Sequence, residues 1–190
     1  MGTRQLRRAI LPATLLLLLF LFIRACVPKP ITDLRLVSLS RVPASALPLT
    51  DFLREPLTKR DEAVWKVSLT GDADWVRQVK RLELNSYATV VRCDQRDFGI
   101  FGLGPYVGQV PVTYYGDGFK DYRPPSTVVK YDVYLPETGR YISQADANAP
   151  MPSYDLAKGR TPLCLRIAGG SMIGAYNRSN EVRVEVDGTH

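Results

Sequence analysis

The stretch that decides the fold is Glu181-Val182-Arg183-Val184-Glu185-Val186, close to the C-terminal end of the chain. Valine alternates strictly with charged residues along it. Because successive side chains of a β-strand point to opposite faces, this alternation produces one apolar face and one charged face. The stretch therefore predicts a strand with one face in a core and the other in solvent.

Other apolar stretches rich in β-branched residues also predict strands. They are residues 34–42, 64–70, 87–93, 128–135 and 163–168. The last of these places Leu163, Leu165 and Ile167 on one face. Turn residues at 136–139 follow the fourth stretch, so we expect residues 140–143 to return as its partner strand.

Residues 73–84 follow a helical period instead. Their apolar residues are Trp75, Val76, Val79 and Leu82. Asp72 stands in front of them, where a carboxylate can cap the first turn. Residues 50–55 predict a second short helix, which Pro56 would end. Many short strands with one or two helices predict a mainly β fold, an antiparallel sandwich or barrel.

The composition is that of a globular protein. The chain has 190 residues, of which 45% are hydrophobic and 23% charged. Disordered and collagen-like classes are excluded by these proportions. Residues 33–190 have the right length for a single domain with one core. Residues 26–32 contain Pro28 and Pro30 and predict a short, stiff spacer in front of this domain.

The start of the chain, residues 1–25, has the character of an export signal. Three arginines precede an uncharged run at residues 9–23, which is leucine at every position from 15 to 19. A basic start followed by such an apolar run is typical of a secretory signal. The run is shorter than the roughly 20 residues that span a bilayer as a helix. We therefore predict that the domain lies outside the cytoplasm.

Ile23-Arg24-Ala25-Cys26 directly follows the apolar run. It resembles the lipobox of bacterial lipoprotein precursors, whose cysteine is lipidated and becomes the new N-terminus. The resemblance covers only the signal segment and implies cleavage after Ala25 and lipidation of Cys26. Val27, where sorted lipoproteins can carry an acid, implies the periplasmic face of the outer membrane. Arg24 replaces the usual small or apolar residue, so an uncleaved inner-membrane anchor with a periplasmic domain is the alternative.

With Cys26 assigned to a lipid, Cys93 and Cys164 remain. In an oxidising compartment such a pair normally forms a disulfide, which we predict here; the alternative is two unrelated buried thiols. Their separation of about 70 residues is similar to that in immunoglobulin domains. However, Trp65 and Trp75 both precede Cys93, so the immunoglobulin pattern is not met.

Catalytic groups are scarce in this sequence. Its one histidine is His190, so we expect no histidine-based catalysis, no metal site and no cofactor. Two pairs of carboxylates are close in sequence: Asp72 with Asp74, and Asp94 with Asp97. Such pairs can hydrolyse a glycosidic bond, one as acid and one as base or nucleophile. Helix capping and solvated turns are the simpler interpretation.

Residues 98–122 are rich in aromatic residues and glycine. They hold seven of the 16 aromatic residues that follow the signal segment, interleaved with six glycines. Tyrosine offers an apolar ring with a polar tip, and this composition is typical of recognition surfaces. We predict a partner-binding face composed of Tyr106, Tyr114, Tyr115, Phe119 and Tyr122. The alternative is a hairpin around residues 116–118 whose rings fill the core.

The net charge of +6 depends on the signal segment. Four arginines and no acidic residues precede Cys26, so the rest of the chain carries 21 basic residues against 19 acidic ones. This near balance excludes nucleic acid as the expected partner.

These observations favour a non-enzymatic, membrane-tethered protein of the bacterial cell envelope that binds another protein. Inhibitors of wall hydrolases and immunity proteins are analogous in size and tethering. One alternative is a structural or assembly accessory lipoprotein of a secretion or pilus machine. Another is a carboxylate-dependent cell-wall hydrolase.

Overall fold

The computed structural model describes Leu16, residues 30–48, and residues 63–188 except 117, 145, 147, 173 and 175. Cys26, most of the predicted signal segment and the predicted helix at 50–55 lie outside the described residues. The account below concerns the described part of the chain.

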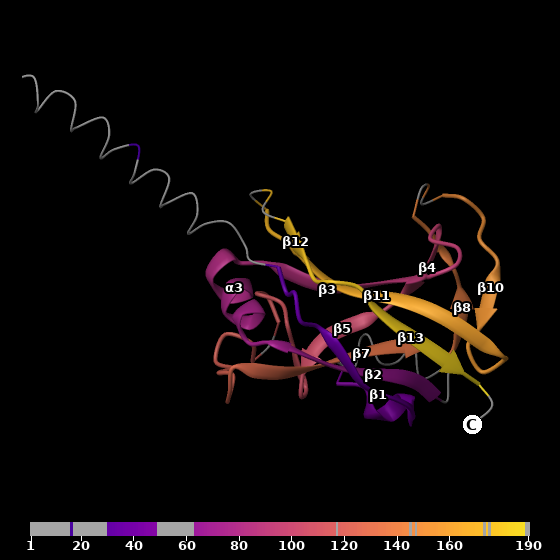
Figure 1. The fold of residues 1–190 in the computed structure, drawn as a ribbon, viewed down its shortest axis with the longest axis horizontal. Coiled ribbons are helices and arrows are strands. Elements are labelled where there is room, and N and C mark those ends of the chain that lie inside the picture. The colour runs from indigo at the N-terminus through magenta and orange to yellow at the C-terminus, as the bar shows by residue number, and fades with distance from the viewer. Residues whose placement is uncertain are drawn as a thin grey trace, which may run out of the picture.

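Most of the described strands form two antiparallel sheets, packed face to face as a sandwich (Figure 1). The first, here the β7 sheet, has the order β1 (Arg35–Pro43), β2 (Ala63–Asp72), β7 (Val128–Pro136), β5 (Leu103–Val107) and β6 (Val110–Pro111). The second, the β11 sheet, has the order β12 (Tyr176–Arg178), β11 (Arg160–Gly170), β3 (Asn85–Arg92), β4 (Phe98–Phe101) and β9 (Ile142–Ser143). β13 (Val182–Asp187) also pairs with β11. The predicted class, mainly β and antiparallel, is confirmed as a sandwich without a closed barrel.

The deciding stretch forms β13 as predicted. Val182, Val184 and Val186 are buried, and the charged residues between them are exposed. β13 pairs with the first part of β11, and β12 pairs with its last part, on the same side. β3 pairs along the other side of β11, so this long strand holds the sheet together.

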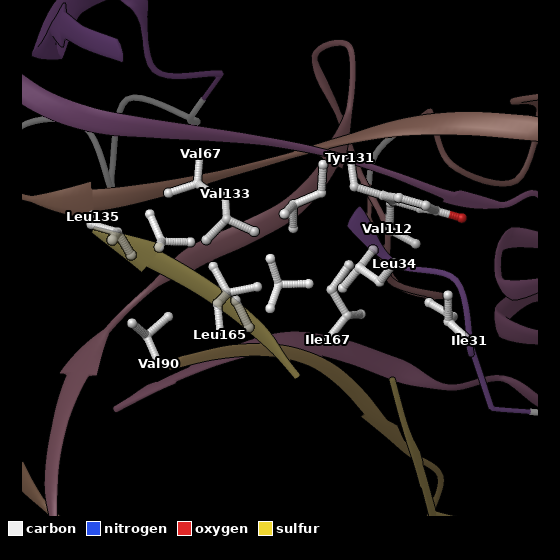
Figure 2. Close-up of a cluster of buried hydrophobic side chains, with 14 of the residues drawn as sticks. Ile31, Leu34, Val67, Val90, Val112, Tyr131, Val133, Leu135, Leu165 and Ile167 are labelled. Carbon is white, nitrogen blue, oxygen red and sulfur yellow. The ribbon is translucent and has the colours of Figure 1, made fainter. Parts of the chain in front are cut away.

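The core fills the space between the two sheets (Figure 2). Val67 and Val133 point into it from the β7 sheet, and Leu165 and Ile167 from the β11 sheet. Burying each of these side chains contributes roughly 1.5–3 kcal/mol relative to leaving it exposed. Ile31 also packs in this core, although we placed it in the spacer. The folded domain therefore includes at least this residue of the predicted spacer.

One helix, α3 (Asp74–Leu82), covers an end of the sandwich. Its first turn is capped as predicted, because the Asp74 N–H donates to Asp72 Oδ1 at 2.8 Å. Trp75, Val76 and Val79 are fully buried. The Trp75 indole N–H also donates to Ser86 Oγ at 3.1 Å, which ties the helix to β3.

The predicted return strand at residues 140–143 does not pair with β7. β7 lies between β2 and β5, so both of its edges are already occupied. The returning chain instead forms β8 (Thr138–Arg140), which pairs with β10 (Ser153–Asp155), and β9, which pairs with β4. The prediction was wrong because the partners of β7 come from distant parts of the sequence.

Candidate binding face

The five predicted partner-binding residues fall into two groups. Tyr106 is only 6% exposed and Phe119 is fully buried, so the prediction is wrong for these two residues. The Tyr106 ring packs edge-on against Tyr134, with ring centroids 5.8 Å apart. Tyr106, on β5, packs in a buried cluster with Leu103 and Tyr134, and Phe119, in the turns after β6, packs in the main core.

The predicted alternative, a hairpin around residues 116–118, is also not observed. The tight hairpin turn lies at Gly108–Gln109, between β5 and β6. The described residues from 112 to 121 form bends and turns beside α3 instead. Leu84 O accepts a hydrogen bond from Tyr114 N–H at 3.1 Å and fixes these turns against the end of the helix.

The other three predicted residues are accessible to different degrees. Tyr122 is half-buried against the core. Tyr114 packs edge-on against Tyr115, and the Lys120 ammonium lies 5.1 Å from its ring centroid. Tyr115 is 60% exposed. These residues lie near α3, and their role in partner binding stays a prediction.

A second set of exposed aromatic residues lies on the outer face of the β11 sheet, here called the β11 face. Ala88 and Val90 of β3 point into the core, so Tyr87, Thr89 and Val91 point outward. Thr89 pairs with Phe101 of β4 on one side and with Arg166 of β11 on the other. Tyr87 is 44% exposed and Phe101 is 59% exposed.

Tyr176 of β12 extends this face at one end. It is 58% exposed, and it lies close enough to Tyr87 to influence its titration. Partial burial and the neighbouring Tyr176 raise the pKa of Tyr87, so its phenol stays neutral at physiological pH. Tyrosine side chains have a polar tip and an apolar ring, which suits a protein-binding surface.

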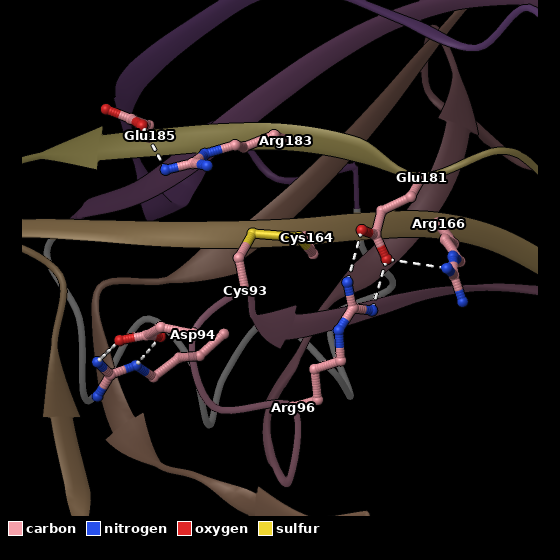
Figure 3. Close-up of a disulfide and its surroundings, with 9 residues drawn as sticks. Cys93, Asp94, Arg96, Cys164, Arg166, Glu181, Arg183 and Glu185 are labelled. Carbon is pink, nitrogen blue, oxygen red and sulfur yellow. Dashed lines mark hydrogen bonds and ion pairs between the residues drawn. A yellow bond between two sulfur atoms is a disulfide. The ribbon is translucent and has the colours of Figure 1, made fainter.

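The charged part of the β11 face surrounds Glu181 (Figure 3). Arg96 donates two hydrogen bonds to its carboxylate, at 2.9 and 3.0 Å, and Arg166 Nη2 lies 2.9 Å from Oε2. The hydrogen bonds from Arg96, with a smaller contribution from the charge of Arg166, lower the pKa of Glu181 despite its partial burial. Two guanidinium groups against one carboxylate leave a positive charge beside the exposed rings.

The predicted disulfide lies in the same region and is confirmed. Cys93 and Cys164 are bonded, with their Cα atoms 5.1 Å apart. Cys93 N–H donates to Pro162 O at 2.9 Å, so the bond joins the end of β3 to its neighbour β11. It braces the sheet below a shallow open depression lined by Thr89, Val91, Arg96, Gln144, Cys164, Arg166 and Glu181.

The composition of the β11 face is that of a protein interface. The register places the following described strand residues on its outer side: Asn85, Tyr87, Thr89, Val91, Gly99, Phe101, Ile142, Arg160, Pro162, Cys164, Arg166, Ala168, Gly170, Tyr176, Arg178, Arg183, Glu185 and Asp187. Arginine and aromatic residues are present, and lysine is absent from this set. Interfaces are enriched in tyrosine, phenylalanine and arginine and depleted in lysine.

A buried polar cluster lies on the outer side of the β7 sheet. Asp132 accepts a hydrogen bond from Ser68 Oγ at 2.6 Å, and Lys66 Nζ lies 2.9 Å from its other oxygen. Burial lowers the pKa of Lys66, but the hydrogen bond and charge of Asp132 outweigh it and raise the pKa. Lys66 therefore stays protonated and is a poor base for activating Ser68. The cluster has the chemistry of a structural site.

Three of the four carboxylates singled out in the sequence, those of Asp72, Asp74 and Asp94, have structural partners. Asp72 caps α3, and Asp74 pairs with Arg77 on the same helix. Asp94 pairs with Arg92, with 2.6 Å between Nη2 and Oδ2. Across the described ranges, no group of three or more His, Cys, Asp or Glu residues could hold a metal ion.

The fold and the face define a small β-sandwich with an exposed aromatic and arginine-rich sheet surface. No protein family, curated protein or solved structure matches the chain. Within the described residues, no helix is long and apolar enough to cross a membrane.

The predicted partner-binding residues did not include Tyr87, Phe101 or Tyr176. The alternation in residues 87–93 contained part of the signal, because Ala88 and Val90 share one face and Tyr87 takes the other. Which of these faces is outside depends on the partner sheet, and a single strand does not reveal that.

Proposed function

We propose that the chain is a non-enzymatic, membrane-tethered protein of the bacterial cell envelope, and that it binds another protein through the β11 face. The observation that carries the proposal is the row of exposed rings beside the Arg96–Glu181–Arg166 cluster. Tyrosine and arginine are the residues most enriched among those that dominate binding energy.

The rigidity of the face supports this function. The rings stand on hydrogen-bonded strands, and the Cys93–Cys164 bond joins two of those strands. A partner that binds such a surface has little backbone to order, so less of the interaction energy is lost. The positive charge left at Arg96 and Arg166 favours a partner with an acidic patch.

The proposed location follows from the N-terminal segment and agrees with the disulfide. Disulfides persist in oxidising compartments such as the periplasm and are rare in the cytosol. Lipidation at Cys26 would hold the domain at the periplasmic face of the outer membrane. An uncleaved segment would hold it at the inner membrane instead.

The test is affinity isolation from the native envelope with the full-length protein and two matched variants. Phe101→Ala removes an exposed ring of the β11 face, and Val128→Ala removes an exposed apolar side chain of β7. We expect a partner that is retained by the wild type and by Val128→Ala and is lost with Phe101→Ala. With purified partner, Phe101→Ala should weaken binding roughly 10- to 100-fold, the effect of removing a central aromatic anchor.

Thermal unfolding separates lost binding from lost folding, because all three proteins should melt at similar temperatures. A specific partner whose binding is unaffected by Phe101→Ala would contradict the β11 face as the binding surface. If the wild type retains no specific partner at all, the binding function itself is contradicted.

A further inference from the structure

Exposed apolar groups also gather at the end of the sandwich that holds α3. Met172, in the turn between β11 and β12, is 92% exposed, and Tyr115 is 60% exposed. The Tyr115 hydroxyl lies 3.9 Å from Met172 Sδ. Both line a shallow depression with Arg81, Leu82, Glu83 and Ser171 at the last turn of α3, here called the end patch.

The chain enters the domain at this same end. Asn180 N–H donates to Ile31 O at 2.9 Å, and Leu34 N–H donates to Asn180 Oδ1 at 2.9 Å. Asn180 lies just after β12, whose strand runs from the turn that carries Met172. Figure 1 shows the start of the described chain beside α3 and β12.

The sequence leaves only a short connection to the apolar run. That run ends at Ile23, and the described domain begins at Pro30. Seven residue steps of fully extended chain span at most about 25 Å. If the N-terminal segment is in a membrane, as the proposed function holds, Pro30 is kept within about that distance of the lipid surface, at the same end of the domain as the end patch.

The chemistry of the end patch matches the headgroup region of a bilayer. Tyrosine is enriched at membrane interfaces because its ring is apolar and its hydroxyl is polar. Transfer of an exposed methionine side chain from water to the acyl boundary is favourable. Arg81, on the outer side of α3, is suited to a lipid phosphate. A protein partner, unlike the lipid, has no particular reason to bind at the end where the chain enters the domain.

We propose that the end patch lies in the interfacial region of the same membrane that holds the N-terminal segment. This inference rests on the tether in the proposed function. The second contact would fix the orientation of the domain relative to the membrane. β3 extends away from this end, so Phe101, which pairs with Thr89 of β3, would remain clear of the lipid for a partner.

The test uses the full-length protein reconstituted in phospholipid vesicles that contain brominated lipids, which quench tryptophan. Met172→Trp places a reporter in the end patch, and Tyr115→Trp is a second reporter there. Phe101→Trp is the matched control on the β11 face. Native Trp65 and Trp75 are buried, so the wild type supplies the background. We expect the added fluorescence of both end-patch reporters to be strongly quenched and that of Phe101→Trp to be unchanged.

Vesicle flotation distinguishes failure of this inference from failure of the tether. If the protein floats with vesicles and neither end-patch reporter is quenched, the inference is wrong and the tether stands. If the protein does not float, the tether is wrong, and this inference is wrong with it. Equal quenching of Phe101→Trp would mean that the β11 face lies on the lipid, which overturns the proposed orientation.

Discussion

The indole of Trp75 lies directly on the backbone of Gly169, joining α3 to β11. A Cβ atom on Gly169 would come within 3.0 Å of Trp75 Cζ2. Trp75 is fully buried and hydrogen-bonded to Ser86, so it cannot move aside easily. The glycine is therefore needed for the helix to pack.

Gly169→Val should lower the free energy of unfolding by about 1–3 kcal/mol, the usual cost of overpacking a core. Urea denaturation monitored by tryptophan fluorescence measures the change. Ser40→Val, at an exposed position of β1, is the matched control and should have little effect. An unchanged midpoint for Gly169→Val would show that the helix can shift away from the strand.

Tyr106 and Tyr115 should respond in opposite ways to truncation, because one ring is buried and the other exposed. Tyr106→Ala should cost about 3–5 kcal/mol of stability, as for other large aromatic residues removed from a core. Tyr115→Ala should change the melting temperature little. Differential scanning calorimetry of both variants checks the assignment, which a stable Tyr106→Ala protein would contradict.

Asp132→Asn should destabilise the domain by about 1–3 kcal/mol, since it removes the negative charge that pairs with Lys66 and replaces one of the two acceptor oxygens with an NH2 donor. Ser68→Ala removes only one donor and should cost less. Equilibrium urea unfolding of both variants at neutral pH gives the comparison. A Ser68→Ala protein that is less stable than Asp132→Asn would mean that the hydroxyl, and not the carboxylate, organises the cluster.

The Cys93–Cys164 bond should contribute roughly 2–5 kcal/mol, because it closes a long loop in the unfolded chain. The double variant Cys93→Ala/Cys164→Ala should unfold at a correspondingly lower denaturant concentration. Reductant should bring the wild type to the same midpoint and leave the double variant unchanged. If complete reduction leaves the unfolding midpoint of the wild type unchanged, the disulfide does not stabilise the domain.

Glu181 should give the domain a pH-dependent increment of stability. Arg96 and Arg166 lower its pKa in the folded state, so the folded protein binds this proton more weakly than the unfolded chain. The increment is complete above the unfolded pKa of about 4.3 and is lost as the pH falls through the lower folded pKa.

Glu181→Gln should therefore melt at most a few degrees below the wild type at pH 7, since the pair is partly exposed. The difference should narrow as the pH falls toward about 3. Glu185→Gln removes a more exposed carboxylate and is the control. A gap between Glu181→Gln and the wild type that widens in acid would have the wrong sign.

Local patterns in the sequence were sufficient to locate the main strands and the helix. The alternation at β13 and the helical spacing in α3 each reflect one buried face, and both segments were found within two or three residues. β7 shows the limit of such patterns. Its second half is buried on both faces, and its partners β2 and β5 lie far away in the sequence.

The exposed residues of the β11 face were harder to predict, for a related reason. Ile100 and Phe101 are adjacent and both apolar, yet Ile100 is buried and Phe101 is exposed. Which side of β4 faces the core is determined by its register with β3 and by the opposing sheet. The abundance of aromatic residues at 98–122 therefore did not show which rings lie in the core and which lie on the surface.

The hydrogen bonds between Asn180 and the entry residues Ile31 and Leu34 have a consequence for the order of folding. The first residues of the domain cannot take their final places until nearly the last have emerged from the ribosome or the export channel. Contacts between such distant residues slow folding and keep the chain unfolded for longer. If the chain is exported before it folds, as proposed, that delay would be an advantage.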